Sequence, residues 1–231
     1  MLEVDGVHAY YAKSHILQGV SFRVGAGEIV SLLGRNGAGR STAVKTIIGH
    51  VPPVGAIRFR GERIDGLKPH EIARKGVGYV PEGREIFPTL TVRENLLLGM
   101  KSARPSGRWR LDDLLALFPL LRERIDAPGG VLSGGEQQML TICRALMGRP
   151  RLILVDEPTE GLSLSMVEQV AKLLGEIAKR GVAIVLVEQK LTIALQCCDR
   201  VNVMGHGRIV FDGTVSEFES DPSVRAHWLE V

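Results

Sequence analysis

The sequence predicts an α/β protein that has a parallel central sheet, an N-terminal antiparallel β layer and an inserted helical lobe. Short, entirely apolar runs such as 152–155 and 182–187 alternate with helical segments in the second half of the chain. Strands this apolar are buried on both faces, and such strands are typical of parallel sheets. Between Pro81 and Gly130 helical signals dominate instead, which indicates that helices are inserted into the α/β core.

The length and composition favour one domain. The chain has 231 residues, of which 45% are hydrophobic and 24% are charged. This is enough material for one large core and less than two ordinary domains need. We therefore expect a single domain over 1–231, with the helical lobe at about 83–150.

Charge and hydropathy exclude several classes of protein. The longest apolar run, 182–187, is far shorter than the roughly 20 residues of a membrane-spanning helix, and the N-terminal residues lack a signal pattern. We therefore expect a cytoplasmic chain. The net charge of +3 is small and the Lys and Arg residues are spread out, which argues against a nucleic-acid partner. We expect the densest basic stretch, 104–110, to be a solvated loop, with docking to a partner as the alternative.

The first half of the chain begins with short β-prone runs separated by turn residues, which predicts the antiparallel layer. An apolar strand then leads through a glycine-rich turn into a helix that ends at Gly49. A later strand stops at Pro81, because proline lacks the N–H that a sheet requires. We expect strands at 2–4, 20–24, 28–33, 56–60 and 77–80, and helices at 41–48 and 69–75.

The second half contains the expected lobe and then the remaining strands and helices. Thr91 and Glu94 have the spacing of a capping box at a helix start, and so do Ser133 and Glu136. The chain ends in an expected hairpin, after which too little sequence follows for a regulatory domain. We expect helices from 91, at 111–121, 134–147, 165–179 and 191–197, and strands at 151–155, 182–187, 201–204 and 208–211.

The glycine-rich turn matches the phosphate-loop spacing GxxxxGK[ST] at every fixed position except one, where Arg40 replaces lysine. Glycines let backbone N–H groups surround a phosphate, and the Ser41 hydroxyl can hold Mg²⁺. Arg40 keeps the positive charge on a larger, planar group. The alternative is a tight turn without a ligand. The predicted nucleotide-binding residues are Gly34, Arg35, Asn36, Gly37, Ala38, Gly39, Arg40, Ser41 and Thr42.

A second motif, LSGGEQQ, occupies residues 132–138. The capping box explains Ser133 and Glu136, but it does not explain Gly134 and Gly135, because glycine weakens the start of a helix. Two glycines at this place are useful where a ligand approaches backbone N–H groups. We therefore add Ser133, Gly134 and Gly135 to the predicted nucleotide-binding residues.

A third motif, LILVDE, ends in two carboxylates at the carboxyl end of a buried strand, where open α/β sheets bind ligands. Asp156 is predicted to hold Mg²⁺, directly or through water. Glu157 is predicted to polarise the water that attacks the γ-phosphate. The alternative is a pair of carboxylates that caps a helix or lies on the surface.

These three motifs, in this order, resemble those of the nucleotide-binding subunits of ABC transporters, and the resemblance covers nearly the whole chain. It implies an ATPase that uses ATP and Mg²⁺ and is coupled to membrane permease subunits. It also implies a head-to-tail dimer in which each ATP is bound by the phosphate loop of one subunit and the signature of the other. Ser133, Gly134 and Gly135 would then act in trans.

Further positions take their roles from this resemblance. Tyr11 lies where an aromatic ring stacks on adenine, with ordinary packing as the alternative. Glu82 lies where most members have a glutamine that senses Mg²⁺ and contacts the permease, and a carboxylate can still bind the metal. Gln189 lies where most members have a histidine near the γ-phosphate; glutamine can position this group but cannot relay a proton. Ser163 replaces the usual aspartate of the loop after Glu157.

Residues 79–88, 160–162 and 187–189 together resemble the smaller ATP-binding subunit of bacterial branched-chain amino-acid importers. That subunit lies on the inner face of the membrane with a second, different ATP-binding subunit, two permeases and a periplasmic or extracellular solute-binding protein. The family docks a permease helix near 82–87. Importers of urea and short amides share the pattern. Another alternative is a weakly hydrolysing subunit, in which Arg40 weakens the hold on phosphate and the partner supplies the turnover.

Other classes with a related loop fit the sequence less well. ABC proteins of DNA repair or translation resemble chains with long coiled-coil insertions or two fused nucleotide-binding halves, and this chain has neither. A nucleotide kinase would have no use for the LSGGEQQ motif.

Overall fold

The computed structural model describes residues 1–101 and 109–230, so the predicted basic loop lies almost entirely outside the described residues. The N-terminal part forms the expected antiparallel layer, with the strand order β2-β1-β4-β5. Its strands are β1 (Leu2–Tyr11), β2 (Ser14–Val24), β4 (Pro53–Phe59) and β5 (Glu62–Arg63). The first two are longer than the sequence indicated, and they continue almost to the turn that joins them.

The second sheet has the order β10-β9-β3-β8-β7-β6. Neighbouring strands run parallel from β9 to β6, and β10 pairs antiparallel with β9 as the predicted hairpin. Every residue of β3, β7 and β8 is buried, which confirms the predicted parallel sheet with two covered faces. The strands are β3 (Ile29–Leu33), β6 (Val77–Val80), β7 (Leu152–Asp156), β8 (Ala183–Glu188), β9 (Arg200–Gly205) and β10 (Arg208–Thr214).

The helices follow the expected order with one correction. The predicted helix at 111–121 is wrong as a single helix, because the chain breaks at Phe118 and restarts at Pro119. Proline lacks an N–H and pushes the preceding residue out of the helical region. The helices are α1 (Arg40–Ile47), α2 (Pro69–Lys75), α3 (Val92–Leu98), α4 (Leu111–Leu117), α5 (Pro119–Glu123), α6 (Gly134–Met147), α7 (Leu164–Lys179) and α8 (Leu191–Cys197).

Two helices beyond the hairpin were not predicted, α9 (Val215–Ser220) and α10 (Pro222–Trp228). Both are short and begin at side-chain caps, with Thr214 accepting from the N–H of Glu217 and Asp221 from that of Ser223. A 3-10 turn (Gly129–Val131) precedes α6. None of the helices among the described residues has the length and hydropathy that crossing a bilayer requires.

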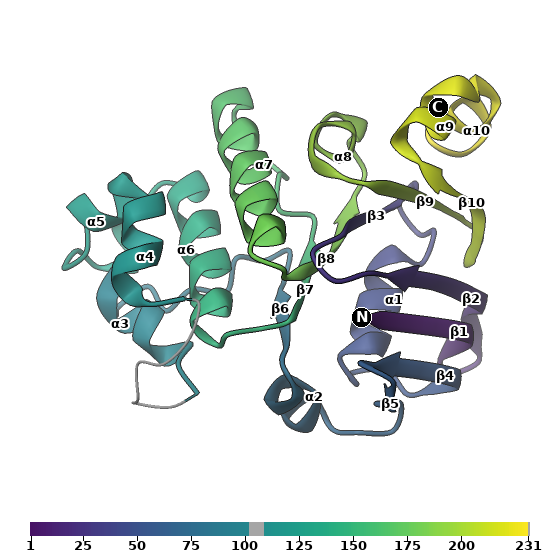
Figure 1. Cartoon of the computed structure of the whole chain (residues 1–231), viewed down its shortest axis with the longest axis horizontal. Coiled ribbons are helices and arrows are strands. Elements are labelled where there is room, and N and C mark those ends of the chain that lie inside the picture. Colours follow the sequence, from purple (N-terminus) through teal and green to yellow (C-terminus); the bar gives the residue numbers. More distant parts are fainter. Residues whose placement is uncertain (102–108, 231) are drawn as a thin grey trace.

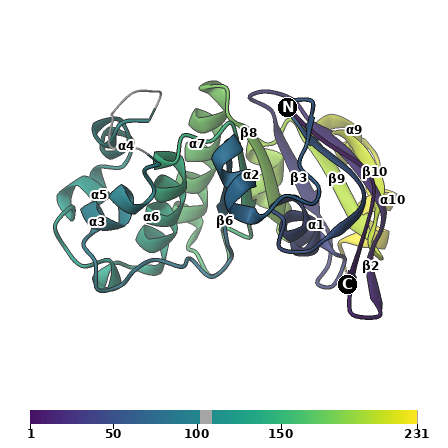
Figure 2. The same cartoon turned by 90° about the horizontal axis from the view of Figure 1, so that it is seen from below.

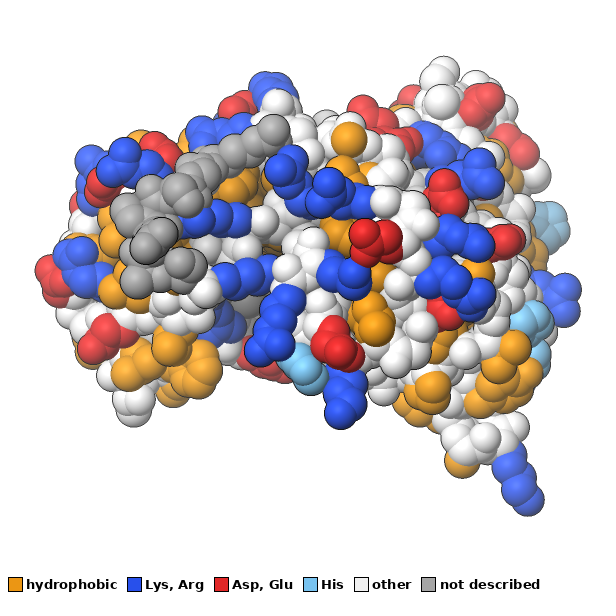
Figure 3. All heavy atoms as spheres, turned by 60° about the horizontal axis from the view of Figure 1, so that its bottom comes forward, with side chains coloured by type: hydrophobic (Ala, Val, Ile, Leu, Met, Phe, Trp, Pro, Cys, Tyr) orange, Lys and Arg blue, Asp and Glu red, His pale blue; other side chains and the backbone are white. Residues whose placement is uncertain are grey.

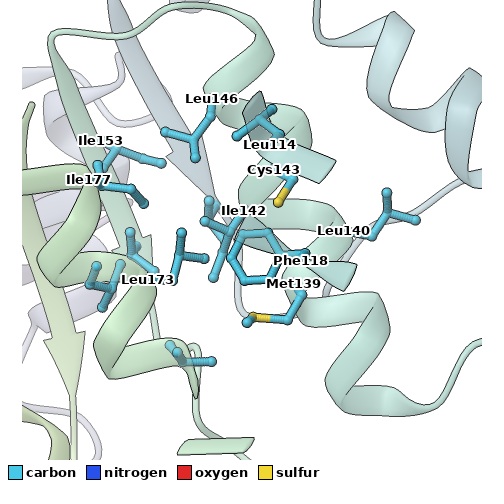
Figure 4. Close-up of a cluster of buried hydrophobic side chains, with 14 of the residues drawn as sticks. Leu114, Phe118, Met139, Leu140, Ile142, Cys143, Leu146, Ile153, Leu173 and Ile177 are labelled. Atoms are coloured by element: carbon cyan, nitrogen blue, oxygen red, sulfur yellow. The ribbon is translucent and has the colours of Figure 1, made fainter. Parts of the chain in front are cut away.

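Two large apolar clusters hold the layers together. One contains Val44 and Ile47 of α1 and fills the space between the antiparallel layer and the parallel sheet. The other lies on the opposite side of the sheet, where α6 and α7 pack beside β7, as Figure 4 shows for Ile142, Ile153 and Leu173. Figures 1 and 2 place the helical lobe, defined here as α3 to α6, at the far end of the molecule from the antiparallel layer. The lobe and α1 are therefore separated by the sheet and α7.

The lobe depends on a close approach between the end of α3 and α6. A Cβ on Gly99 would lie 2.0 Å from the carbonyl oxygen of Arg144 and 3.0 Å from the Cβ of Met147. Backbone atoms cannot give way as a flexible side chain can. We predict that Gly99→Ala lowers the free energy of unfolding by about 2 kcal/mol, because it forces the two helices apart.

Gly175→Ala is the matched control for this change. Gly175 lies inside α7 and a Cβ there would have open space, so the alanine should raise the free energy of unfolding by about 1 kcal/mol through helix propensity. Urea unfolding of both variants measures the difference. Equal stability of the two would contradict the close packing of α3 on α6.

Candidate functional site

The carboxyl ends of three neighbouring parallel strands lie at one edge of the sheet. The register pairs Leu33 of β3 with Glu188 of β8, and Asp156 of β7 with Val187 of β8. The predicted phosphate loop follows β3, Glu157 follows β7 and Gln189 follows β8. Segments far apart in the sequence are thus brought to the place where α/β sheets bind ligands.

The phosphate loop connects β3 to α1, and its positions require glycine for more than one reason. Gly37 has φ of 83° with open space beside its Cα, so its backbone conformation alone favours glycine. At Gly34, by contrast, a Cβ would lie 2.6 Å from the carbonyl oxygen of Met204. The turn after β9 also holds the loop, since the N–H of Gly207 donates to the carbonyl oxygen of Ala38 at 3.1 Å. Helix α1 begins without a side-chain cap, which leaves its first N–H groups for a ligand.

Arg40 joins the loop to the predicted catalytic carboxylate. Its side chain is only 4% exposed, and Nη2 lies 2.8 Å from Oε1 of Glu157 and 3.1 Å from Oδ1 of Asn36. Nη1 of the same guanidinium is buried and has no hydrogen-bond partner among the described residues. An unsatisfied buried donor costs about 1–3 kcal/mol, which an anion bound at the loop would offset.

Ser41 and Asp156 form the second contact between the loop and β7. The Ser41 hydroxyl donates to Oδ1 of Asp156 at 3.0 Å, and Asp156 is almost completely buried. Burial raises the pKa of Asp156, although the hydrogen bond from Ser41 opposes this shift. A hydroxyl beside a carboxylate suits Mg²⁺, which prefers oxygen ligands.

Glu157 lies directly after β7 in an uncommon backbone conformation. Its φ is 45°, and its N–H donates to the carbonyl oxygen of Val187 at 2.9 Å, which fixes the turn to β8. Carboxylate oxygens of Glu82, Glu157 and Glu160 all lie within 4.8 Å of one another. Burial raises the pKa of Glu82, and the charges of Glu157 and Glu160 raise it further. The structure therefore places Glu82 with these two glutamates, at a point where a cation would relieve their repulsion.

One buried carboxylate was missed by the sequence analysis. Glu188, at the end of β8, accepts hydrogen bonds from Thr159 Oγ1 at 2.7 Å and from the Thr159 N–H at 3.2 Å. Burial raises its pKa, and the charge of Glu157 adds to the shift. The sequence did contain a signal for this residue, because Glu188 ends an apolar strand just as Asp156 does. Gln189, the predicted neighbour of the γ-phosphate, is exposed.

The two adjacent tyrosines at the end of β1 differ in their surroundings. The ring of Tyr10 stacks on His15, with 4.3 Å between centroids and 14° between planes. Tyr11 is 46% exposed at the last position of the strand. Tyr10 is 43% exposed, so exposure does not separate the two rings, and the stacking on His15 covers only part of the Tyr10 ring.

The signature begins α6 as the capping box predicted. Ser133 Oγ accepts from the N–H of Glu136 at 3.4 Å, and the Glu136 carboxylate accepts from the N–H of Ser133 at 2.7 Å. A Cβ on Gly134 would lie 2.7 Å from Nη1 of Arg84, and one on Gly135 would lie 2.8 Å from Met166. Both neighbours are flexible side chains that can move, so packing inside the chain does not by itself require glycine at these two positions. Both cartoon views show α6 well apart from the loop at α1 (Figures 1 and 2).

Comparison with known proteins gives matches along the chain. The family model for ABC transporters matches residues 17–160. The high-affinity branched-chain amino acid transport ATP-binding protein BraG of Pseudomonas aeruginosa is 43% identical, over 99% of both chains. The probable branched-chain amino acid transport ATP-binding protein LivF of Archaeoglobus fulgidus is 34% identical, over 94% of this chain and 93% of that protein.

Solved structures agree with this assignment. A structure of an ATP-binding subunit of an ABC transporter has a TM-score of 0.84 at 32% identity, covering 100% of this chain and 96% of that one. A dimeric ATP-binding cassette in a post-hydrolysis state, bound to ADP and Pi, has a TM-score of 0.81 at 26% identity, covering 93% and 99%. These findings confirm the family and the fold that the three motifs predicted. The chain belongs to the ABC transporter family, as one of its ATPase cassettes.

Proposed function

We propose that this chain binds ATP with Mg²⁺ and hydrolyses it to power the import of branched-chain amino acids. The observation that carries the proposal is the meeting of Arg40 and Ser41 of the phosphate loop with Asp156 and Glu157 at one edge of the sheet. The 43% identity to BraG over the full length supports the solute class. The subunit would act on the cytoplasmic face of the membrane, attached to permeases and supplied by a solute-binding protein on the other side.

Different residues of the site would contact different parts of the nucleotide. The loop 34–42 would surround the phosphates with its backbone N–H groups, and Tyr11 would stack on adenine. Ser41 and Asp156 would hold Mg²⁺, with Glu82 close by. When bound, this ion neutralises charge that develops on the β- and γ-phosphates.

Glu157 would orient and polarise the attacking water, and Gln189 would donate a hydrogen bond to the γ-phosphate. Nη2 of Arg40 lies 2.8 Å from Oε1 of Glu157. Phosphate oxygens would compete for the same guanidinium, so ATP binding would release the carboxylate. The phosphate loop and the catalytic base are thereby coupled through one side chain.

Completion of the site would require a second subunit. The N–H groups after Ser133, at Gly134 and Gly135, would contact the nucleotide held by the partner's phosphate loop. The separation of α6 from α1 within one chain supports this arrangement, because the signature cannot reach its own loop without unpacking the lobe. The partner would be a second ATP-binding subunit, identical or different.

The same ion pair also favours a second candidate, a subunit that binds ATP and hydrolyses it poorly beside an active partner. Arg40 is larger than lysine and is held by both Asn36 and Glu157, so part of its charge is already compensated when ATP arrives. For the solute, a urea or amide importer remains the alternative, because none of the site residues would touch the transported molecule.

Replacement of the proposed base tests its role. We predict that Glu157→Gln retains ATP binding and stabilises the ATP-bound dimer, while kcat falls by about 100-fold or more, since the amide cannot polarise water. Glu168→Gln is the matched control, because Glu168 is an exposed residue of α7 outside this carboxylate cluster. Steady-state ATPase assays and size-exclusion chromatography with ATP give the two readouts. Unchanged turnover in Glu157→Gln would rule the assignment out.

Substitution of Arg40 separates the two candidate functions. Arg40→Ala should weaken ATP binding by about 10-fold or more, the effect of losing a hydrogen bond to a charged group. Arg40→Lys should leave kcat within about threefold of the wild type if the native chain is an efficient ATPase. A rise of about tenfold or more would support the weakly hydrolysing subunit. Fluorescent-nucleotide titration and ATPase assays measure both, and no effect of either change would mean that this side chain does not hold phosphate.

A further inference from the structure

A hollow of about 290 Å³ lies where the end of α2 meets the turn between α6 and β7. Its described lining contains no carboxylate and holds six cationic side chains, from Arg60, Arg74, Lys75, Lys101, Arg149 and Arg151. We call it the basic hollow. Figure 3 shows the corresponding face, where Lys and Arg side chains form a band between the lobe and the antiparallel layer.

Such an excess of positive charge is not general on this protein. A second hollow, of about 310 Å³, is lined by three arginines and by three carboxylates. In that balanced hollow Arg200 forms an ion pair with Asp212. The two hollows are similar in size, so the contrast lies in the charge of their linings.

The dipole of α2 explains some of the cationic side chains that line the basic hollow. Helix α2 ends there, and cations stabilise the free carbonyl groups at a helix C-terminus, which accounts for Arg74, Lys75 and Lys101. Lys101 indeed donates to the carbonyl oxygen of Ala73, and Lys75 pairs with Glu62 at 2.6 Å. The same reason does not apply to Arg60, in the turn after β4, or to Arg151, directly before β7.

The backbone of the basic hollow also carries strain at two arginines. Arg60 and Arg149 both have φ of 55°, in the left-handed region that disfavours residues with a Cβ. A residue with better backbone preference, such as asparagine or glycine, would suit each turn. Keeping arginine at both positions is consistent with a use for the two side chains.

The basic hollow continues into a larger groove of about 410 Å³. Phe87 and Leu98 line the groove, and Lys101 and Gly148 line both cavities. Under the function proposed above, on which this inference rests, this groove would receive the permease helix that the family resemblance places near 82–87, since Phe87 lines it. The polypeptide that leaves this helix would then pass over the basic hollow.

We propose that the basic hollow binds an acidic cytoplasmic segment of the permease, adjacent to the helix docked in the groove. Arginine forks bind carboxylates through paired hydrogen bonds, and several such pairs fix the register of a peptide. A lipid headgroup is a weaker candidate. A docked helix, about 10 Å across, would lie between this face and the bilayer and hold the headgroups away.

Charge reversal at the basic hollow tests the proposal. The test variant carries Arg74→Glu and Arg151→Glu together. The control variant carries Arg23→Glu and Arg58→Glu, which makes the same change of charge in the balanced hollow. Each chain is titrated against nanodiscs that hold the permease pair co-purified with the wild-type chain. We expect affinity to fall by about tenfold or more for the first variant, and by less than about twofold for the control.

Two further measurements, in nanodiscs of different lipids and on the chain without permease, separate the possible causes of a loss of affinity. The loss should be equal in nanodiscs of phosphatidylcholine and of phosphatidylglycerol, and the ATPase activity of the detached chain should not change. A loss confined to the anionic lipid would make the headgroup the occupant and overturn the proposal, and so would equal affinity of the two variants. If the wild-type chain binds no permease, the proposed function itself fails. The neutral pair Arg74→Gln and Arg151→Gln repeats the test if the reversed chain folds poorly, with a smaller loss expected in the same direction.

A crosslinking experiment identifies the occupant directly. A photo-reactive amino acid in place of Arg74, with one in place of Arg58 as control, is activated in the assembled transporter, and the products are identified by mass spectrometry. We expect the first to capture a permease peptide rich in Asp and Glu, and the second not to capture it. Capture of lipid alone, or of no permease peptide, would contradict the proposal.

Discussion

The burial of β3, β7 and β8 on both faces is the constraint on which the rest of the structure depends. Helices must cover each side of these strands, so charged groups can be accommodated only at the strand ends. The parallel register brings the carboxyl ends of the three strands together. The loop, the two carboxylates at the end of β7 and the segment after β8 meet for this reason, although long stretches of sequence separate them.

At the carboxyl ends of these strands, the guanidinium of Arg40 contacts a carboxylate and would also have to bind a phosphate. Arg40 occupies the position that usually carries a compact ammonium group, and in this chain it is buried against Glu157 and Asn36. Under the proposed function, phosphate oxygens would compete with this carboxylate for the donors of the planar guanidinium. The distribution of this one charge would then connect nucleotide affinity to the release of the proposed base, Glu157.

Local signals in the sequence predicted most of the fold, because apolar strands, capping boxes and helix-ending glycines act over a few residues. The helices α2, α6 and α8 have the predicted bounds. The prediction failed where a single residue outweighed periodicity, at Pro119, and where short capped helices left no long apolar pattern, in α9 and α10. The contact of Arg40 with Glu157 could not be read from the sequence, since it joins a side chain at the start of α1 to one directly after β7, which only the folded chain brings together.

The turn after β9 supports the phosphate loop, so the loop depends on residues far from it in the sequence. Gly207 donates to Ala38 in the phosphate loop, and Met204 crowds Gly34 in the same loop. The loop precedes β9 in the sequence, so these contacts come from residues that are synthesised well after it. On the ribosome, therefore, the loop would lack these contacts until the turn after β9 has been synthesised and has folded against it.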